Sequence, residues 1–458
     1  MDDLLMRYLL LFMGIISTGV IASYPTGTNT VLGSYANRQS LITSSYNPAA
    51  PYLMTNISSF RAGFLGPLNL GFEMGDVKDL EDQVEDLEEV FDEDYSDAFT
   101  SLSASELSAL GLSSSSTDAE IAEALLNSDN EVSRAIAQAN RVLSNIGESA
   151  YVKFSGSVHA PFTPIIYKTN NRGAFTIDAD ASFVNRVGIL ADDIGLAVSG
   201  EEVDLATDTA VHVKKVTDYR FGIGYSQALG RPVSGALILG GKLNFHSMGL
   251  GQEVVLVSSD EDSSDSFDDF FMSRKNAQSN VSIDLGAIWT AKNYQLGATV
   301  KSLNEPEFDF DEIGNCEGLS GSSLSNCNAI GRLSNNGQLS LNETYKMKAQ
   351  LTVDAAIMST NQNWSLAASH DVNSVADPVG DRHQWNTVSL SYFSGNLFFP
   401  GIRLGYRKNE SGSKLSYMTM GTTLFRRLDF DLAYSLEKVS GESIPRSLYL
   451  SLAYGFAF

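Results

Sequence analysis

The sequence predicts an all-β fold: a transmembrane antiparallel β-barrel of about 14–16 strands, with an N-terminal hatch segment in the lumen and a small α-helical insert. Three observations predict it. The first residues are ordered like an export signal, apolar and polar residues alternate in repeated segments, and the chain ends on an aromatic residue of one such segment. The mean hydropathy of -0.07 suits a barrel, which hides its apolar residues by alternation, and equally suits a soluble all-β protein. Composition alone therefore does not decide between the two.

The N-terminus is ordered like a secretory signal peptide. Arg7 supplies a positive charge, the apolar run from Tyr8 to Val20 follows it, and Ala22 suits the position before a cleavage site. The acidic residues ahead of Met6 are unsuited to such a signal, so we expect translation to start at Met6. We therefore expect residues 1–22 to be removed on export. A transmembrane anchor is the alternative, but a membrane span needs about 20 apolar residues.

Residues 23–65 form an N-terminal segment ahead of the first barrel strand, which is predicted at residues 66–76. The segment is rich in Ser, Asn, Thr, Tyr and Pro, and residues 23–57 hold no clear strand. It contains a candidate hatch motif, made of Asn47, Pro48, Ala49 and Ala50. An Asn-Pro pair is also typical of an ordinary turn, and both interpretations stay open at this point.

Residues 77–149 are predicted to be an acidic helical insert. Apolar residues step by three and four, the spacing of a coiled-coil seam, at Val77, Leu80, Val84, Leu87 and Phe91. About two heptads are too short for a stable lone coiled coil, so two further helices, at 105–110 and 117–145, are expected to pack against them. The acidic face is a candidate docking surface for a periplasmic protein, although acidic runs are usually only solvated.

The remainder of the barrel is predicted over residues 150–458. About fifteen segments alternate as strands, near 66–75, 151–160, 173–184, 193–206, 217–228, 235–248, 280–290, 293–302, 343–358, 363–371, 384–393, 400–408, 414–425, 428–437 and 446–458. Tight and long connections alternate, as in barrels with short periplasmic turns and long outer loops. An odd count conflicts with two periplasmic termini, so either a strand near 52–64 is missing or the N-terminal segment threads the lumen first. The same count places the insert on the periplasmic side.

Charged residues recur on the second face of these strands and are expected to face the lumen. The candidates are Asp178, Asp180, Asp284, Lys346, Lys348, Asp354, Arg403, Arg407, Asp429 and Asp431. Such charges could form a constriction or hold the hatch by salt bridges. The alternative is that they are simply solvated in a wet interior.

The net charge limits the kind of partner the protein can bind, and the two cysteines indicate the cellular compartment. The formal net charge of -24 argues against a nucleic-acid partner, because binding phosphate requires clustered Lys and Arg. Cys316 and Cys327 lie close together in a Gly/Ser/Asn-rich stretch, which in an exported chain indicates a disulfide. A two-thiolate metal site is the alternative, but no His lies nearby. Calcium binding by the acidic run 260–269 is a further alternative, although its spacing matches no EF-hand loop.

The C-terminus shows the sharpest alternation. One face of the last segment is apolar and aromatic, and its members include Leu450, Leu452, Tyr454, Phe456 and Phe458. This ending resembles the insertion signal of outer-membrane barrels, which the barrel assembly machinery reads. It predicts the outer membrane of a Gram-negative bacterium as the location, with outer-membrane lipid and that machinery as partners.

The whole layout resembles the FadL-like outer-membrane transporters, with a signal peptide, the Asn47–Ala50 element and a barrel that ends on Phe458. In that group the N-terminal segment is a hatch inside the lumen, so the resemblance implies the same for residues 23–65. More narrowly, the acidic heptad after the first strand resembles the barrel-type family of conjugal transfer protein TraF. That family differs from the thioredoxin-like TraF, and no CxxC pair occurs here. The resemblance implies a porin-like outer-membrane protein.

Two functions follow as hypotheses. The first is a FadL-like or porin-like channel for small, possibly hydrophobic molecules, and the alternative is a structural protein of conjugal transfer that docks partners through the insert. A third hypothesis, an outer-membrane hydrolase, is disfavoured because none of the five histidines sits in a motif with a nucleophile and an orienting acid. We expect no enzyme activity, no catalytic residue, no cofactor and no metal.

Overall fold

The structure, a computed structural model, describes residues 25–54, 59–77, 83, 87, 90, 104–113, 116–169, 173–199, 202–229, 235–257, 277–393, 396–440 and 443–457. The predicted signal peptide, most of the predicted heptad, the acidic run 260–269 and Phe458 lie outside these residues.

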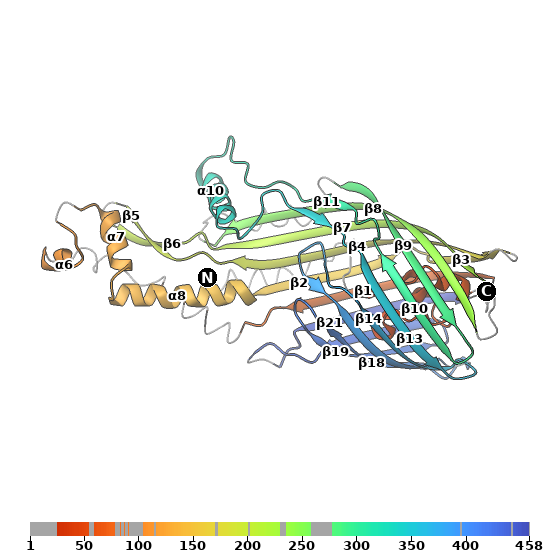
Figure 1. Ribbon diagram of the computed structural model, residues 1–458. Coiled ribbons are helices and arrows are strands. Elements are labelled where there is room, and N and C mark those ends of the chain that lie inside the picture. Colours follow the sequence, from red (N-terminus) through yellow and green to blue (C-terminus); the bar gives the residue numbers. More distant parts are fainter. Residues whose placement is uncertain are drawn as a thin grey trace.

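A closed antiparallel β-barrel with fourteen strand positions forms the body of the described chain (Figure 1). In chain order the positions are β1 (Phe60–Met74), β2 (Tyr151–His159) together with β3 (Ile165–Thr169), β4 (Gly173–Leu190), β7 (Ala210–Ala228), β8 (Ala236–Leu256), β9 (Gln278–Thr290), β10 (Tyr294–Lys301), β13 (Gln350–Met358), β14 (Trp364–Asp371), β17 (Trp385–Tyr392), β18 (Gly401–Asn409), β19 (Ser416–Leu424), β20 (Leu428–Ser435) and β21 (Ser447–Ala457). The first and last strands pair, with Asn69 opposite Ser451, and this pairing closes the sheet. The predicted fold class is confirmed.

One position in the wall is shared by two short strands. β2 pairs with the second half of β1, from Leu68 onward, whereas β3 pairs with its first residues, Phe60 to Ala62. Both also pair with β4. Residues 160–164 interrupt the strand between them, and the facing part of β1 carries two register shifts between Gly63 and Leu68. Pro164 suits such an interruption because it has no backbone N–H to donate to a ladder.

The outer surface of the barrel is apolar. Leu366 on β14 is 51% exposed, while its neighbours Ser365 and Ala367 are buried. Because successive side chains of a strand point to opposite faces, this alternation puts leucine outside and small residues inside. Trp364 and Tyr392 contact each other at the end of the strands near the tight turns, with ring centroids 4.6 Å apart. An apolar belt edged by aromatic residues is the surface of a membrane-spanning barrel.

The two ends of the barrel differ. β1 begins beside the end of β21, with Arg61 opposite Ala457. At that end the described strands are joined by tight turns such as 291–293 and 425–427. The long connections, including the helical insert, leave the opposite end (Figure 1). Barrels carry long loops outside and short turns in the periplasm, so the predicted periplasmic placement of the insert is corrected to the long-loop end.

The insert was predicted on the wrong side because the prediction contained one barrel strand too many. Residues 193–206, predicted as a barrel strand, form a hairpin of β5 (Gly195–Ser199) and β6 (Glu202–Ala206), which pair only with each other. A hairpin returns the chain to the end it left, whereas a strand crosses the membrane. No strand is missing near 52–64 either, because residues 50–54 are helical and β1 already begins at Phe60.

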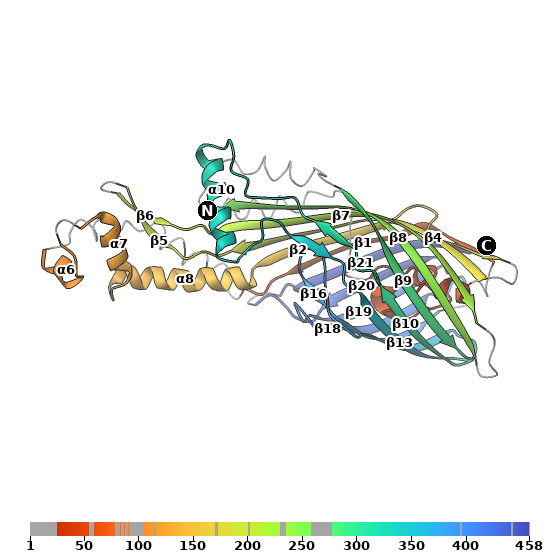
Figure 2. The same cartoon turned by 45° about the horizontal axis from the view of Figure 1, so that its top comes forward.

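The helical insert projects beyond the long-loop end in both views (Figures 1 and 2). Its described helices are α6 (Ala104–Ala109), α7 (Asp118–Leu126) and α8 (Glu131–Ser149). Both predicted helices are present, and the second is split because Asn130 caps a new helix, accepting a 2.7 Å hydrogen bond from the backbone N–H of Ser133. Leu87 of the predicted seam is buried in a cluster with Ile136 and Leu143 of α8. The expected packing of the heptad on these helices is thus present where it is described.

A second long connection folds over the mouth of the barrel. It contains β11 (Glu307–Asp309), α10 (Gly321–Asn335) and β12 (Thr344–Lys346). Phe308 is fully buried in a cluster with Val216 and Met248, which lie on the parts of β7 and β8 toward the long-loop end. Cys316 and Cys327 form a disulfide within this connection, which staples the start of α10 to the chain before it.

The N-terminal segment lies inside the barrel (Figure 1). It forms α2 (Asn29–Leu32), the 3₁₀ helix η1 (Leu41–Ser45) and α3 (Ala50–Met54). Leu32 and Leu53 are almost completely buried there. We refer to residues 25–54 as the hatch. Among the helices in the described part of the chain, none is long and apolar enough to cross a membrane.

Candidate functional site in the barrel lumen

The hatch is held by hydrogen bonds from the wall to its backbone. Arg407 of β18 donates through one guanidinium nitrogen to the carbonyls of Asn29 and Thr30, at 3.2 and 3.3 Å. Arg61 of β1 donates to the carbonyl of Arg38 at 2.8 Å. Hydrogen bonds that involve a charged donor are stronger than neutral ones, so these contacts fix the hatch from separate strands.

The predicted hatch motif sits against a flat part of the wall. A Cβ atom at Gly240 would lie 2.0 Å from the carbonyl oxygen of Pro48, and one at Gly286 would lie 2.1 Å from Oδ1 of Asn47. Any side chain at these two positions would therefore displace the motif. Asn47 Oδ1 accepts the backbone N–H of Ala49 at 2.9 Å, which closes the turn. The element Asn47–Ala50 therefore forms an ordinary turn and also makes a contact between the hatch and the wall.

One side of the lumen carries a ladder of paired charges across β4, β7 and β8. Lys242 Nζ lies 2.6 Å from Asp178 Oδ2, and both side chains are buried. Arg220 Nε donates to Asp180 Oδ2 at 3.0 Å. Asp284 on β9 accepts from Asn244 at 2.8 Å. Three of the predicted lumen residues thus face inward and pair with wall residues on neighbouring strands.

The other side of the lumen carries a second charge cluster. Arg403 lies 2.9 Å from Asp431 and 3.5 Å from Asp429. Arg407 also lies over the ring of Trp385, 4.8 Å from its centroid. The four lumen candidates on these strands therefore lie on the inner face, and among them Arg407 is the one that touches the hatch.

The remaining candidates divide between two places. Asp354 is buried on the inner face of β13. Lys346 and Lys348 lie on and just after β12, outside the barrel strands, where their ammonium groups pair with Glu307 at 2.9 Å and Glu305 at 3.3 Å. The predicted strand 343–358 ran through this point, whereas the structure begins β13 only at Gln350.

The loop between the predicted strands 363–371 and 384–393 crosses the lumen. Residues 372–384, which we call the strap, contain β15 (Val375–Ala376) and β16 (Arg382–His383) and connect β14 to β17. Lys153 on β2 lies 2.6 Å from Asp377 and 3.0 Å from Asp381. Five strands separate β17 from β2 in one direction (β18, β19, β20, β21 and β1), and five separate β14 from β4 in the other (β13, β10, β9, β8 and β7). The strap is therefore fastened to the wall opposite its own.

The pKa values of the two strap carboxyls that pair with Lys153 are shifted in opposite directions. Burial raises the pKa of Asp377, although Lys153 opposes the rise. Burial also disfavours the charged form of Asp381, but Lys153 and Arg186 together outweigh it and lower the pKa of that carboxyl. Arg186 on β4 lies 3.2 Å from Asp381. Two cations and two carboxylates thus form a closed latch that joins the strap to β2 and β4.

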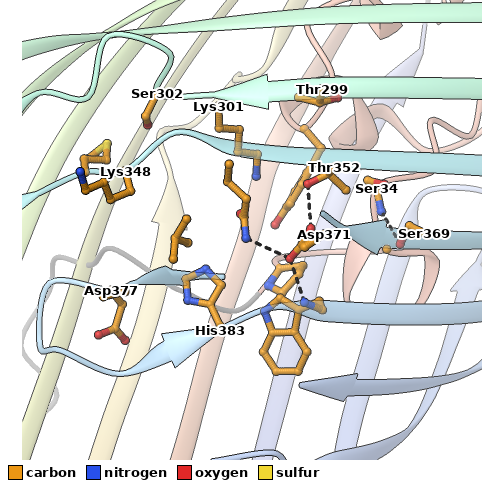
Figure 3. Close-up of a pocket in the computed structure, with 18 of the residues that line it drawn as sticks. Ser34, Thr299, Lys301, Ser302, Lys348, Thr352, Ser369, Asp371, Asp377 and His383 are labelled. Carbon is orange, nitrogen blue, oxygen red and sulfur yellow. Dashed lines mark hydrogen bonds between the residues drawn. The ribbon is translucent and has the colours of Figure 1, made fainter. Parts of the chain in front are cut away.

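A cavity of about 210 Å³ lies between the hatch and the strap (Figure 3). Its lining includes Tyr46 of the hatch, Lys301 of β10, His383 of the strap and Trp385 of β17. Lys301 and His383 reach into it from facing elements (Figure 3). Burial lowers the pKa of His383 to about 4, so its imidazole is neutral near pH 7. Within the described residues, no group of three or more His, Cys, Asp and Glu side chains could hold a metal ion.

The described chain is a closed barrel with an apolar belt, tight turns at one end, long loops at the other and the hatch inside its lumen. These are the features of an outer-membrane β-barrel protein. The chain belongs to the family described as "F plasmid transfer operon, TraF, protein", whose sequence model matches residues 44–371. The resemblance to the barrel-type TraF family is confirmed. No curated protein sequence matches the chain.

Several solved structures are similar at low identity. The toluene transporter TbuX of Ralstonia pickettii is 12% identical with a TM-score of 0.42, over 95% of this chain and 99% of that chain. The toluene transporter TodX of Pseudomonas putida is 11% identical with a TM-score of 0.40, over 95% and 98%. A FadL homologue of Pseudomonas aeruginosa is 11% identical with a TM-score of 0.34, over 96% and 100%. Similarity at this level assigns no ligand to this chain.

Proposed function

We propose that this protein is a gated outer-membrane channel for small molecules, closed at rest by the hatch on one side and the strap on the other. The observation that carries the proposal is the cavity between these two elements, which is lined by residues of the hatch, the wall and the strap. A purely structural barrel would need neither a separate strap nor a space behind it. The lumen of a barrel of this size is wider than wall side chains alone would fill.

Solute passage requires both elements to move. The strap is held by Lys153, and the hatch is held in part by Arg407, so the two can be loosened separately. Both attachments join a side chain of the wall to a chain segment that connects or precedes barrel strands. Loosening them leaves the strand ladders of the barrel intact.

The test is the swelling of liposomes that contain the purified protein, with arabinose as the permeating solute. We compare the wild type with K153M, R407M and the double variant. The double variant is expected to admit the sugar faster than either single variant, and the wild type is expected to stay near the rate of protein-free liposomes. K408M is the control, because Lys408 pairs with Glu410 and takes no part in either attachment. A double variant as tight as K408M would overturn the proposal.

A second candidate function is a docking role in conjugal transfer, which the family description favours. The specific observation is that α7 and α8 project past the long-loop end, away from the barrel wall (Figure 2). A partner of the insert would then approach from outside the cell and not from the periplasm. Removal of residues 78–148 that abolishes mating while preserving solute flux through K153M/R407M would support this role. Normal mating by the shortened chain would refute it.

A further inference from the structure

Lys301 stands apart from the other cations of the lumen. Lys242 has Asp178 at 2.6 Å and Lys153 has Asp377 at 2.6 Å. In the described part of the chain, no carboxylate lies within ion-pair distance of the Lys301 ammonium. Its one recorded contact is the ring of Tyr46, whose centroid lies 4.5 Å away. A cation over an aromatic face gains some electrostatic energy but keeps its hydrogen-bond donors unused.

The two carboxylates whose charges act on Lys301, Asp284 and Asp371, are already engaged by other donors. Asp371 accepts from Thr352 at 2.7 Å, and its other oxygen accepts from Gln350 at 3.1 Å and from the backbone of Trp385 at 2.9 Å. Asp284 accepts from Asn244 and from the backbone N–H of Ser302. A carboxylate that holds such donors has little capacity left for a lysine.

The rest of the lining holds polar groups and apolar surface. Its two carboxylates, Asp371 and Asp377, are already held by hydrogen bonds and by Lys153. His383 has a buried Nδ1 with no hydrogen-bond partner among the described residues. Met347, Val375 and Trp385 supply carbon surface in the same lining. A ligand that satisfies this site needs an anionic head for Lys301 and a small apolar body. A cavity of about 210 Å³ is of the same order as an engineered apolar cavity of about 150 Å³ that binds benzene, so its size suits a single ring.

We propose that the cavity binds a compact organic carboxylate, with its oxygens on the ammonium of Lys301 and its apolar body against Trp385 and Met347. The proposal rests on the proposed channel and names the ligand class of that channel. Lys301 lies between hatch and strap and contacts Tyr46 of the hatch. A carboxylate on Lys301 would use the ammonium donors that the contact with the Tyr46 ring leaves free.

The test is isothermal titration of the detergent-solubilised full chain with benzoate, and with benzamide as the neutral probe of the same shape. The latch variant K153M serves as the background, because it removes the strap as a barrier to entry. Benzoate is expected to bind, and K301M is expected to weaken it by about tenfold or more, as loss of a hydrogen bond to a charged group does. K301R keeps the charge and is expected to retain binding. K346M is the control, because Lys346 is paired with Glu307 and is not part of the cavity lining.

Each other outcome overturns the proposal. Equal binding of benzoate and benzamide, or unchanged binding in K301M, removes the role of the charge. Displacement of benzoate by inorganic phosphate at equal concentration would show a site for oxyanions without use of the apolar wall. No binding of benzoate in the K153M background would remove the ligand class altogether, while sugar flux through K153M/R407M would still support the channel.

Discussion

Lys153 Nζ lies 2.6 Å from Asp377 Oδ2, although the two residues are separated by 224 positions in the sequence and belong to opposite sides of the barrel. The contact is buried, and it fastens the strap to the opposite wall of the barrel. In the proposed channel, this contact is what keeps the strap over the lumen.

Replacing Lys153 by Met is expected to free the strap. The change leaves two carboxylates, Asp377 and Asp381, without their shared cation, and breaking a buried pair in this way costs about 3–5 kcal/mol. Trypsin should then cleave after Arg382, which is exposed on the strap, faster than in the wild type. Cleavage is followed by mass spectrometry of the fragments. K408M is the control, and equal cleavage rates in K153M and K408M would contradict the latch.

Acid is expected to loosen the closed strap through His383. Burial lowers the pKa of this imidazole from 6.5 to about 4, so the closed state binds fewer protons than the open state between these values. The closed state therefore loses stability as the pH falls through this window. Asp377, whose pKa is raised, acts in the opposite direction. The histidine is isolated by comparing sugar flux at pH 7 and pH 4.5 in R407M, whose hatch is loosened, and in R407M/H383Q: acid should raise the flux more in R407M.

Alanine at Gly240 is expected to unseat the hatch. The added Cβ would lie 2.0 Å from the carbonyl oxygen of Pro48, which has no flexible end to move away. The expected loss is about 1–3 kcal/mol, the usual cost of overpacking. Gly241 is the matched control, because a Cβ there would meet Leu285 at 3.6 Å, an ordinary contact. Thermal unfolding of the two variants in detergent measures the difference, and equal midpoints would show that the motif is not seated there.

Replacing Phe458 by Ser is expected to slow insertion of the barrel. The terminal aromatic lies outside the described residues, so this prediction rests on the alternation that includes Leu450, Leu452 and Tyr454. Folded and unfolded forms migrate differently in unheated gels, and the folded fraction in membranes is the readout. Ser at Leu436, which is exposed beyond the end of β20, is the control. Wild-type assembly of the Phe458 variant would remove the insertion signal.

The sequence predicted the wall well because a membrane barrel repeats one rule in every strand. Asp178 and Arg403 could be placed inside from their parity alone, since a side chain in a strand has only two faces to choose from. The same rule failed at residues 193–206, where two short strands of a hairpin share the period of one long strand. Because this hairpin was counted as one barrel strand, the helical insert was predicted at the periplasmic end instead of the long-loop end.

The site was harder to predict than the wall. The latch joins Lys153 to a loop, and no local pattern links a residue to a partner 224 positions away. Lys301 was also missed, because a lumen-facing lysine is notable only once its neighbours are known to be occupied. The hatch motif was found because a family resemblance pointed to it, and the glycines that receive it, Gly240 and Gly286, had no such signal.

The hatch and the strap are attached to different strands and close different ends of one cavity. If they open in turn, a solute can cross while at least one of them is shut, so no continuous column of water ever joins the two sides of the membrane. The cell could then take up a compact molecule without admitting larger or unrelated ones. On this view, selectivity comes from the order of two movements as much as from the width of the pore.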